Sequence, residues 1–176
     1  MTTAVALGLT LAFEPRDPDV MRRPPLPPSL PLLTGEVVRR IVFVSVILLA
    51  GAFTAFHWQL SAGATLEQAR TVAVNAFVAA QIAYLVNCRS LTDLRPHVGF
   101  LSNPWLLVGI GTTVVLQALF TYAPTMNTLF HTAPIGWTAW AFIAALAAFA
   151  YLLVELDKWR QRHARADRSV PILPVR

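Results

Sequence analysis

The side chains that could do chemistry in this sequence are a few amides and hydroxyls inside long apolar stretches. Asn75 and Gln81 fall in the apolar stretch 69–88, and Tyr84 follows Gln81 by about one helical turn. An amide can offer its carbonyl oxygen to a cation, but it can equally hydrogen-bond a neighbouring helix. Because an unpaired polar group is costly in hydrocarbon, such residues are candidate functional positions. For both amides, hydrogen bonding between helices is the favoured interpretation.

A second polar pair occurs in the stretch 105–122. Thr113 and Gln117 are four residues apart, so they share one face of a helix. A threonine inside a helix can bond back to its own main chain, so a structural role is favoured here too. Gly109 and Gly111 are expected to permit close helix packing.

Two further groups lie at the edges of apolar runs. Thr3 belongs to the short apolar segment 1–13, where it is a helix-capping candidate when taken alone. Glu155 and Lys158 are three residues apart and predict an interfacial ion pair of little energetic weight. No carboxylate lies well inside an apolar run, which argues against a self-sufficient cation transporter.

The composition indicates that these residues are positioned by membrane helices. The 176 residues are 56% hydrophobic and 13% charged, with a mean hydropathy of +0.56. A soluble domain has about 25% charged residues, so a soluble enzyme is excluded. The net charge of +5 comes from basic residues placed between apolar runs, so we expect no nucleic-acid partner. With Cys88 as the only cysteine and four dispersed histidines, no local metal cluster is predicted.

The apolar runs predict four full transmembrane helices. From Pro96 to Val154 there is no Asp, Glu, Lys or Arg, and these 59 residues suit two spans, divided near Pro124, Pro134 and Gly136. The predicted spans are about 41–60, 69–88, 105–122 and 137–155, within a membrane domain of residues 41–160. The fold class is therefore an all-α membrane protein, an antiparallel helical bundle of four full helices plus the end of a fifth.

The flanking segments complete this organisation. Residues 1–13 reach about 20 Å as a helix, too short for a core of about 30 Å, so they are interpreted as the end of a membrane helix. Residues 14–40 contain seven prolines and five arginines and predict a cytoplasmic loop. Residues 161–176 predict a basic cytoplasmic tail. Thirteen of the fourteen basic residues then lie on one side, so the positive-inside rule places the C-terminus in the cytoplasm. We expect an integral, multi-pass protein of the plasma membrane.

Seven strings in register carry a family resemblance. They are LGLTLAFEP, DPDVMRRPP, ARTVAVN, YLVNCRSL, SNPWL, LQALFTYAPTMNTLF and LVELDKWRQR. Together they resemble the C-terminal membrane domain of P-type cation-transporting ATPases, a family that includes calcium pumps. The resemblance implies that residues 1–13 end the sixth membrane helix of a pump and that the four spans are helices seven to ten. The family's phosphorylated Asp, in a DKTGT motif, is not in this sequence, so the chain is not expected to be an enzyme on its own. No cofactor is expected here, whereas the parent pump would use ATP and Mg²⁺.

The resemblance also implies an ion path. The family's sixth helix carries N-x-x-T-D, of which Thr3 matches the Thr while Ala4 replaces the Asp. The eighth helix carries a Glu twelve residues after the Ala of its ART motif, and that position is Gln81. Thr3 and Gln81 are therefore the candidate metal ligands. With both carboxylates replaced, only neutral oxygens remain for a hard cation, so the identity of a transported ion stays open.

These observations lead to one principal expectation and two rivals. The chain is expected to scaffold ion-binding helices in ATP-driven cation transport, with the bilayer, the other helices and cytoplasmic domains of a pump, and the cation as partners. One alternative is a small non-enzymatic membrane protein that associates with or regulates a complete pump. The other is an unrelated small permease that works as an oligomer.

Overall fold

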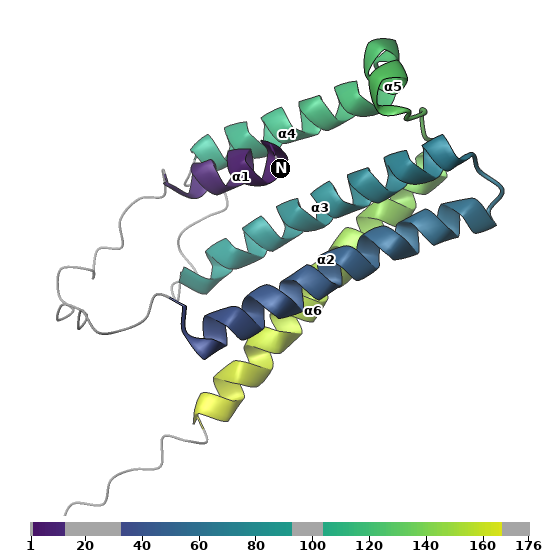
Figure 1. Cartoon of the computed structure of the whole chain (residues 1–176). Helices are drawn as coiled ribbons and strands as arrows, with labels where there is room; N and C mark the ends of the chain where they lie inside the picture. Colours follow the sequence, from purple (N-terminus) through teal and green to yellow (C-terminus); the bar gives the residue numbers. More distant parts are fainter. Residues whose placement is uncertain (1, 13–32, 93–103, 167–176) are drawn as a thin grey trace, which may run out of the picture.

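A computed structural model describes residues 2–12, 33–92 and 104–166 of the chain. This part is helical, and Figure 1 shows long helices that run in alternating directions. The helices are α1 (Thr2–Ala12), α2 (Gly35–Ser61), α3 (Leu66–Thr92), α4 (Pro104–Tyr122), α5 (Pro124–Phe130) and α6 (Trp137–Ala166). Four of them, α2, α3, α4 and α6, are long and apolar enough to cross a membrane. The predicted all-α membrane bundle with four full spans is thus confirmed.

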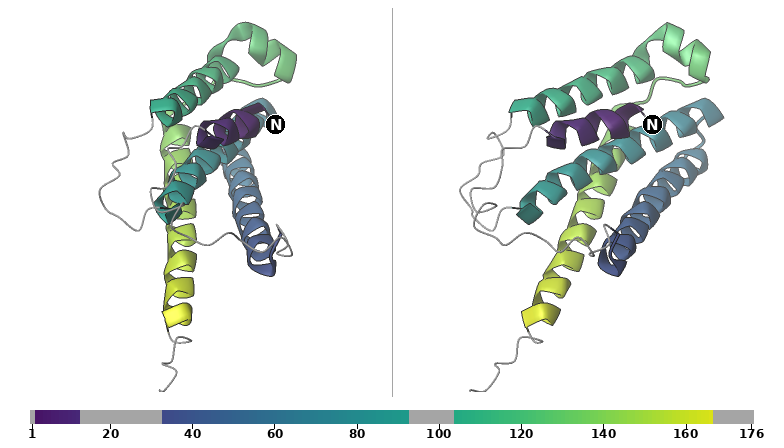
Figure 2. Two further views of the ribbon diagram at one scale, coloured as in Figure 1. Left: turned by 90° about the vertical axis from the view of Figure 1, so that its left-hand side faces the viewer. Right: turned by 60° about the vertical axis from the view of Figure 1, so that its left-hand side comes forward.

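The helix α3 is the centre of the bundle. It packs closely against α2 and α6 and also touches α1 and α4. The helices α2 and α4 lie on opposite sides of it (Figures 1 and 2). One core cluster joins small and branched residues of α2, α3 and α6, among them Ala55, Val72 and Ile143. Small side chains such as Ala55 allow the helix backbones to approach closely, which is the usual way helices associate in lipid.

A tight hairpin connects α2 to α3. Gly63 has φ +81°, a left-handed conformation that glycine adopts without a steric penalty. Thr65 and Gln68 then form a reciprocal capping box, in which each main-chain N–H donates to the other side chain at 3.2 Å. The start of α3 is therefore encoded by residues close to it in the sequence, and the hairpin sets α2 beside α3.

The short helix α1 lies against α4. Leu7 of α1, Leu85 of α3 and Leu106 of α4 form a second core cluster. The contact is closest at Gly109, where a Cβ atom would collide with the Thr10 methyl group. The prediction that Gly109 allows close packing is confirmed. Gly111, for which the same role was predicted, has no neighbour within 4 Å of its Cβ position.

The helix ends extend past the predicted spans. Thr34 caps α2, since its side-chain oxygen accepts from the Val37 N–H at 3.4 Å, so residues 35–40 of the predicted loop are helical. At the other end of the chain, α6 continues to Ala166. In both cases polar residues continue the helix beyond its apolar span, and the prediction, which used the apolar runs, ended with that span. Residues 13–32, 93–103 and 167–176, which include most of the predicted loop and tail, lie outside the described residues.

The helix α5 lies between the predicted spans 105–122 and 137–155, where no helix was predicted. Pro124 occupies the first turn, where its missing N–H costs nothing, and His131 ends the helix in a left-handed conformation with φ 51°. Seven residues are too few to produce a readable hydrophobic period, which is why the pattern gave no signal.

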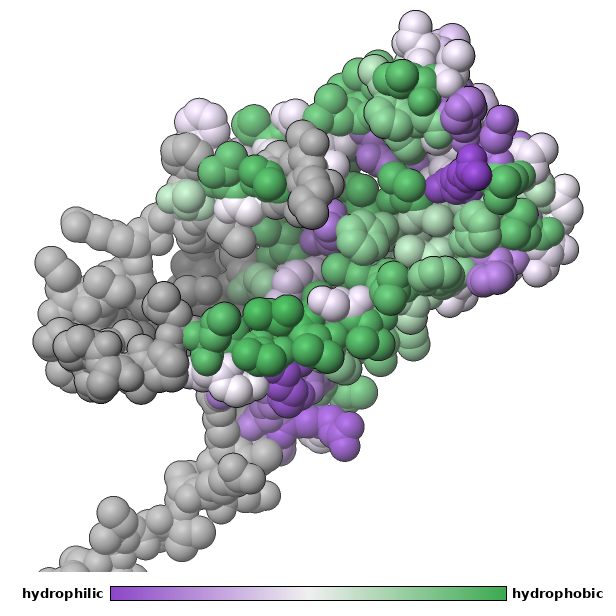
Figure 3. Space-filling model, in the orientation of Figure 1, coloured by the Kyte–Doolittle hydropathy of each residue, from purple (hydrophilic) through white to green (hydrophobic). Residues whose placement is uncertain are grey.

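The outer surfaces of the long helices are apolar. Figure 3 shows hydrophobic residues along much of the visible face of the bundle. Val46, Leu49 and Phe53 of α2 are each more than half exposed, as are Val108 and Val115 of α4. In α4 the polar residues face inward and the apolar residues outward, since three of its four buried side chains are polar. Lipid or other membrane helices are the natural surroundings of such a surface.

Candidate functional site

The two candidate ion ligands lie together. The Thr3 hydroxyl of α1 donates to Oε1 of Gln81 on α3 across 3.5 Å, although the residues are 78 positions apart. Gln81 also borders a cavity of about 270 Å³ between α1, α2 and α3. The other residues lining this cavity are Leu7, Gly8, Val44, Leu48, Tyr84, Leu85 and Cys88. The structure therefore brings both predicted residues to one place.

The donor set at this place is neutral. A hydroxyl and an amide oxygen are the ligand types that hard cations accept, but two of them fall well short of the six or more oxygens of a complete calcium site. Within residues 2–12, 33–92 and 104–166, no three His, Cys, Asp or Glu side chains are grouped as metal ligands. A cation held here would need further ligands, and the role of Thr3 and Gln81 as ligands stays a prediction.

A positive charge stands near the same cavity. Arg40 of α2 and the Cys88 thiol both interact with the Tyr84 hydroxyl. The Nη2 atom of Arg40 is buried and has no hydrogen-bond partner among the described residues. A guanidinium near the cavity repels cations. This charge and the absence of the two carboxylates therefore both disfavour the binding of a cation here.

Asn75 connects α3 to α4. Its Nδ2 donates to the Thr71 carbonyl at 2.9 Å and to the Thr121 hydroxyl at 3.0 Å. The predicted role of this amide in joining helices is confirmed. Thr113 bonds back to the Gly109 carbonyl at 2.8 Å, also as predicted, and both Thr113 and Gln117 are buried on the inner face of α4.

A second set of bonds fastens the end of the bundle near α5. Trp140 Nε1 of α6 donates to the Tyr122 hydroxyl of α4 at 2.8 Å, and this hydroxyl donates to the Ile135 carbonyl at 3.1 Å. The Ala133 N–H donates to the Thr71 hydroxyl at 3.1 Å. The segment between α5 and α6 is thus tied to α3 and α4, which positions α4 relative to the rest.

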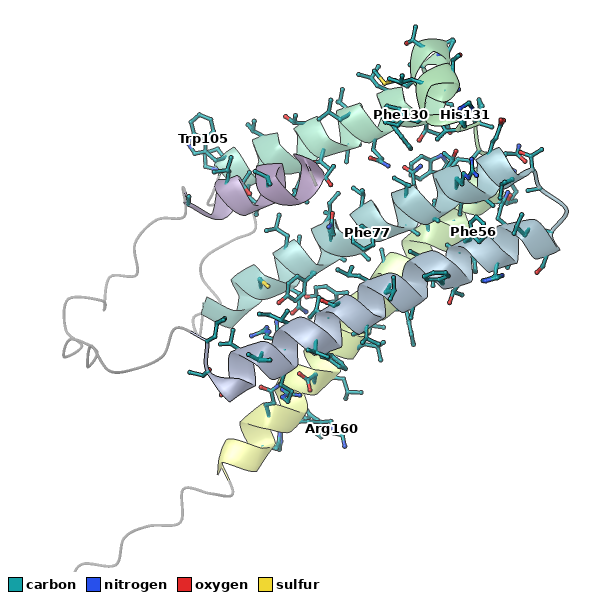
Figure 4. All side chains as sticks on the ribbon, in the orientation of Figure 1. Phe56, Phe77, Trp105, Phe130, His131 and Arg160 are labelled. Atoms are coloured by element: carbon teal, nitrogen blue, oxygen red, sulfur yellow. The ribbon has the colours of Figure 1, made fainter. Side chains whose placement is uncertain are left out.

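Lys158 is buried and has more hydrogen-bond partners than the sequence indicated. The predicted ion pair with Glu155 is present at 3.0 Å, but the Lys158 side chain is only 4% exposed. Its Nζ also donates to the Asn87 carbonyl of α3 at 2.7 Å, and the Asn87 amide donates to Glu155 at 3.0 Å. The predicted pair is therefore present, while the burial of Lys158 and its bond to Asn87 were not predicted, and the small energetic weight of the pair stays a prediction. By contrast, Arg160 projects away from the other helices (Figure 4).

Asn87 was missed as a functional position. It is fully buried, six residues after Gln81 on α3, and it joins α3 to α6. The available signal was an amide within an otherwise apolar run near the helix end, the same signal that singled out Asn75 and Gln81.

Comparison with known proteins agrees with this architecture. The model of the family "Cation transporting ATPase, C-terminus" matches residues 1–160. A Mycobacterium tuberculosis protein named "Probable cation-transporting ATPase F" is 46% identical over 157 residues, covering 89% of this chain and 17% of the relative. "Cation-transporting ATPase pma1" of Synechocystis is 34% identical over 149 residues, covering 80% of this chain and 16% of the relative.

A mouse protein is more distantly similar. "Calcium-transporting ATPase type 2C member 2" is 26% identical over 166 residues, covering 94% of this chain and 18% of the relative. The chain thus spans about a sixth of the length of the curated relatives it matches. The family match, the relatives and the four membrane helices agree, and the chain belongs to the family of C-terminal membrane domains of P-type cation-transporting ATPases.

Proposed function

We propose that this chain works in ATP-driven cation transport as the membrane scaffold that positions ion-binding helices of a P-type pump. The observation that carries the proposal is the contact between the Thr3 hydroxyl and the Gln81 amide. It joins α1 to α3 inside the apolar zone, at the two positions that the family resemblance marks as ion ligands. In this role Thr3 and Gln81 supply neutral oxygens, and the remaining ligands come from other helices of the pump.

In this proposal the chain does not hydrolyse ATP by itself. The phosphorylated aspartate, the nucleotide pocket and the bound ATP and Mg²⁺ belong to parts of the pump outside these 176 residues. The pump lies in the plasma membrane with the basic C-terminal segment in the cytoplasm. The excess of arginines beside one end of the spans supports this orientation.

The proposal is tested with a chimera of the 46% identical mycobacterial relative, in which this chain replaces the matching segment. We expect the chimera to retain cation-stimulated ATP hydrolysis. Replacing Gln81 by Ala removes a contact to a charged ligand worth about 1.5 kcal/mol or more, so the cation concentration for half-maximal hydrolysis should rise about tenfold.

The matched control is Gln59→Ala, which removes an amide near the end of α2 that does not line the cavity at Gln81. This variant should leave the cation dependence unchanged. An inactive chimera that is nevertheless inserted and folded would contradict the scaffold function. An unchanged cation dependence in the Gln81→Ala chimera would contradict the ion-path role.

A further inference from the structure

A cavity of about 260 Å³ lies between α2, α3 and α6. The small side chains of Ala76 and Ala80 on α3 and Ala150 on α6 form its floor, and each is less than a tenth exposed. Val46 of α2 and Phe149 of α6 stand at its rim and are each 59% exposed. This cavity, called the lateral niche below, therefore reaches from the outer apolar surface inward to the central helix. The ion path proposed above does not use it.

Two contacts between α2 and α6 close the lateral niche along the helices. Trp58 of α2, four residues beyond the lining residue Thr54, stacks on Phe142 of α6 with ring centroids 4.0 Å apart and planes 9° apart. Beyond the other end of the lining, Arg39 of α2 donates two hydrogen bonds to the Asp157 carboxylate of α6, at 3.2 and 3.3 Å. Because α3 forms the floor, the niche opens sideways, toward the surroundings of the bundle.

The dimensions of the lateral niche fit a single chain of carbon atoms. The lining of α2 runs from Val46 to Thr54, which is about 12 Å along a helix with a rise of about 1.5 Å per residue. A volume of about 260 Å³ over this length gives a mean cross-section of about 22 Å². A helix is about 10–12 Å across and needs about 80 Å² or more, so it is too wide. Carbon atoms pack about 3.5–4.0 Å apart, so one extended hydrocarbon chain needs roughly 12–16 Å².

The chemistry of the lining also favours hydrocarbon. None of the described lining residues is charged, so an ion or a phosphate would lose its hydration there without compensation. Thr54 is the one lining residue with a polar side chain, and a threonine inside a helix can bond a carbonyl of its own preceding turn. An empty niche would deprive its lining atoms of dispersion contacts, which an apolar occupant restores. At the level of the membrane spans, the hydrocarbon within reach is the acyl chain of a phospholipid.

We propose that the lateral niche binds one acyl chain of a bilayer phospholipid. The chain enters between Val46 and Phe149 and lies against the alanines of the floor, so it fills the space that α2 and α6 leave between their two contacts. The Arg39 charge beside this space is already balanced by Asp157. The acyl chain, and not the charge of the headgroup, therefore determines binding.

The test uses the whole chain in phosphatidylcholine nanodiscs that contain a small fraction of a phosphatidylcholine with a diazirine in the middle of one acyl chain. Illumination attaches this lipid to the residues it touches, and mass spectrometry locates them. We expect labelling of Ala80 and Ala150 on the floor, as well as of the exposed Val42 of α2 and Leu119 of α4. Labelling of Val42 and Leu119 without Ala80 or Ala150 would overturn the proposal, as when a side chain of another helix fills the niche.

Two glycine substitutions separate a bound chain from general contact with lipid. Gly51 lines the lateral niche, and nothing lies within 4 Å of its Cβ position. Gly51→Leu should therefore fill the niche without a collision and abolish the labelling of the floor, while Val42 and Leu119 remain labelled. Gly111→Leu is the matched control, because its Cβ position on α4 is equally open and lies outside the niche lining.

The control variant should leave all four labelled residues unchanged. Leucine favours a helix more than glycine does, and helical content by circular dichroism identifies folded variants. A phosphatidylglycerol that carries the same diazirine should label the floor to the same extent. Unchanged floor labelling in folded Gly51→Leu protein, or its loss in folded Gly111→Leu protein, would contradict an acyl chain held in the lateral niche.

Discussion

Replacing Gly109 by Ala tests how α1 is held against α4. At this position an added methyl group collides with the Thr10 methyl group, and it would also lie 3.3 Å from Thr10 Cβ. The Thr10 side chain is buried, and its hydroxyl donates to the Leu7 carbonyl at 2.7 Å, so it has little freedom to move. The two helices must therefore separate or α1 must shift along its axis.

The magnitude follows from the cost of overpacking. Inserting a methyl group into a filled contact typically costs about 1–3 kcal/mol. Thr10→Ser removes the colliding methyl group but keeps the hydroxyl that bonds Leu7. The double variant should therefore recover most of the stability lost by Gly109→Ala, giving a favourable coupling of about 1 kcal/mol or more between neighbouring sites. Gly111→Ala is the matched control, because nothing lies within 4 Å of its Cβ position.

The assay is the unfolding of the chain in mixed micelles by increasing SDS, followed by circular dichroism. We expect a lower midpoint for Gly109→Ala, a restored midpoint for the double variant, and no decrease for Gly111→Ala. A Gly109→Ala midpoint equal to that of Gly111→Ala would refute the close contact. Destabilisation that Thr10→Ser fails to relieve would show that another neighbour is responsible.

Three further substitutions test the polar connections. Lys158→Ala removes hydrogen bonds from a buried ammonium, so it should lower the free energy of unfolding by about 1.5–3 kcal/mol, whereas Arg160→Ala at the exposed face should change it by about 0.5 kcal/mol or less. Arg39→Gln breaks the two-bond pair with Asp157, at 3.2 and 3.3 Å, in which the side chains are 48% and 20% exposed. Its cost should be small and should shrink in 0.5 M salt, where charges are screened within about 4 Å; a cost independent of salt would contradict this. Tyr122→Phe removes the hydroxyl shared by Trp140 and Ile135, and should cost about 1–3 kcal/mol in SDS unfolding.

The spans were predictable because their signal is long and uniform. A run such as 41–60 contains no charged residue. In hydrocarbon its main-chain N–H and C=O groups must bond to one another, and a helix satisfies them all within the run. The ends were less predictable, since Thr34 caps α2 with a local hydrogen bond that hydropathy does not register. The same limit applies to α5, whose start depends on Pro124 and whose end depends on the conformation of His131.

The site was predictable only in part, because adjacency in space depends on distant segments. The apolar stretch 69–88 placed Gln81 in a helix and left its partner open, and the family resemblance marked Gln81 and Thr3 as candidate ligands. Nothing in the spacing of Glu155 and Lys158 revealed that Asn87 of α3 would cover the ammonium group. Burial of that lysine results from the packing of α3 against α6, which a linear pattern cannot express.

The contact between Thr10 and Gly109 constrains the order in which the chain assembles. At about 5–20 residues per second, a ribosome needs roughly 5–20 s to proceed from one of these residues to the other. During that interval the hairpin of α2 and α3 is complete, whereas α1 lacks its principal neighbour. Among the described helices that precede α4, α3 is the one that α1 contacts, near Gln81. The bond from Thr3 to Gln81 is thus a contact of α1 whose two partners are both synthesised before α4.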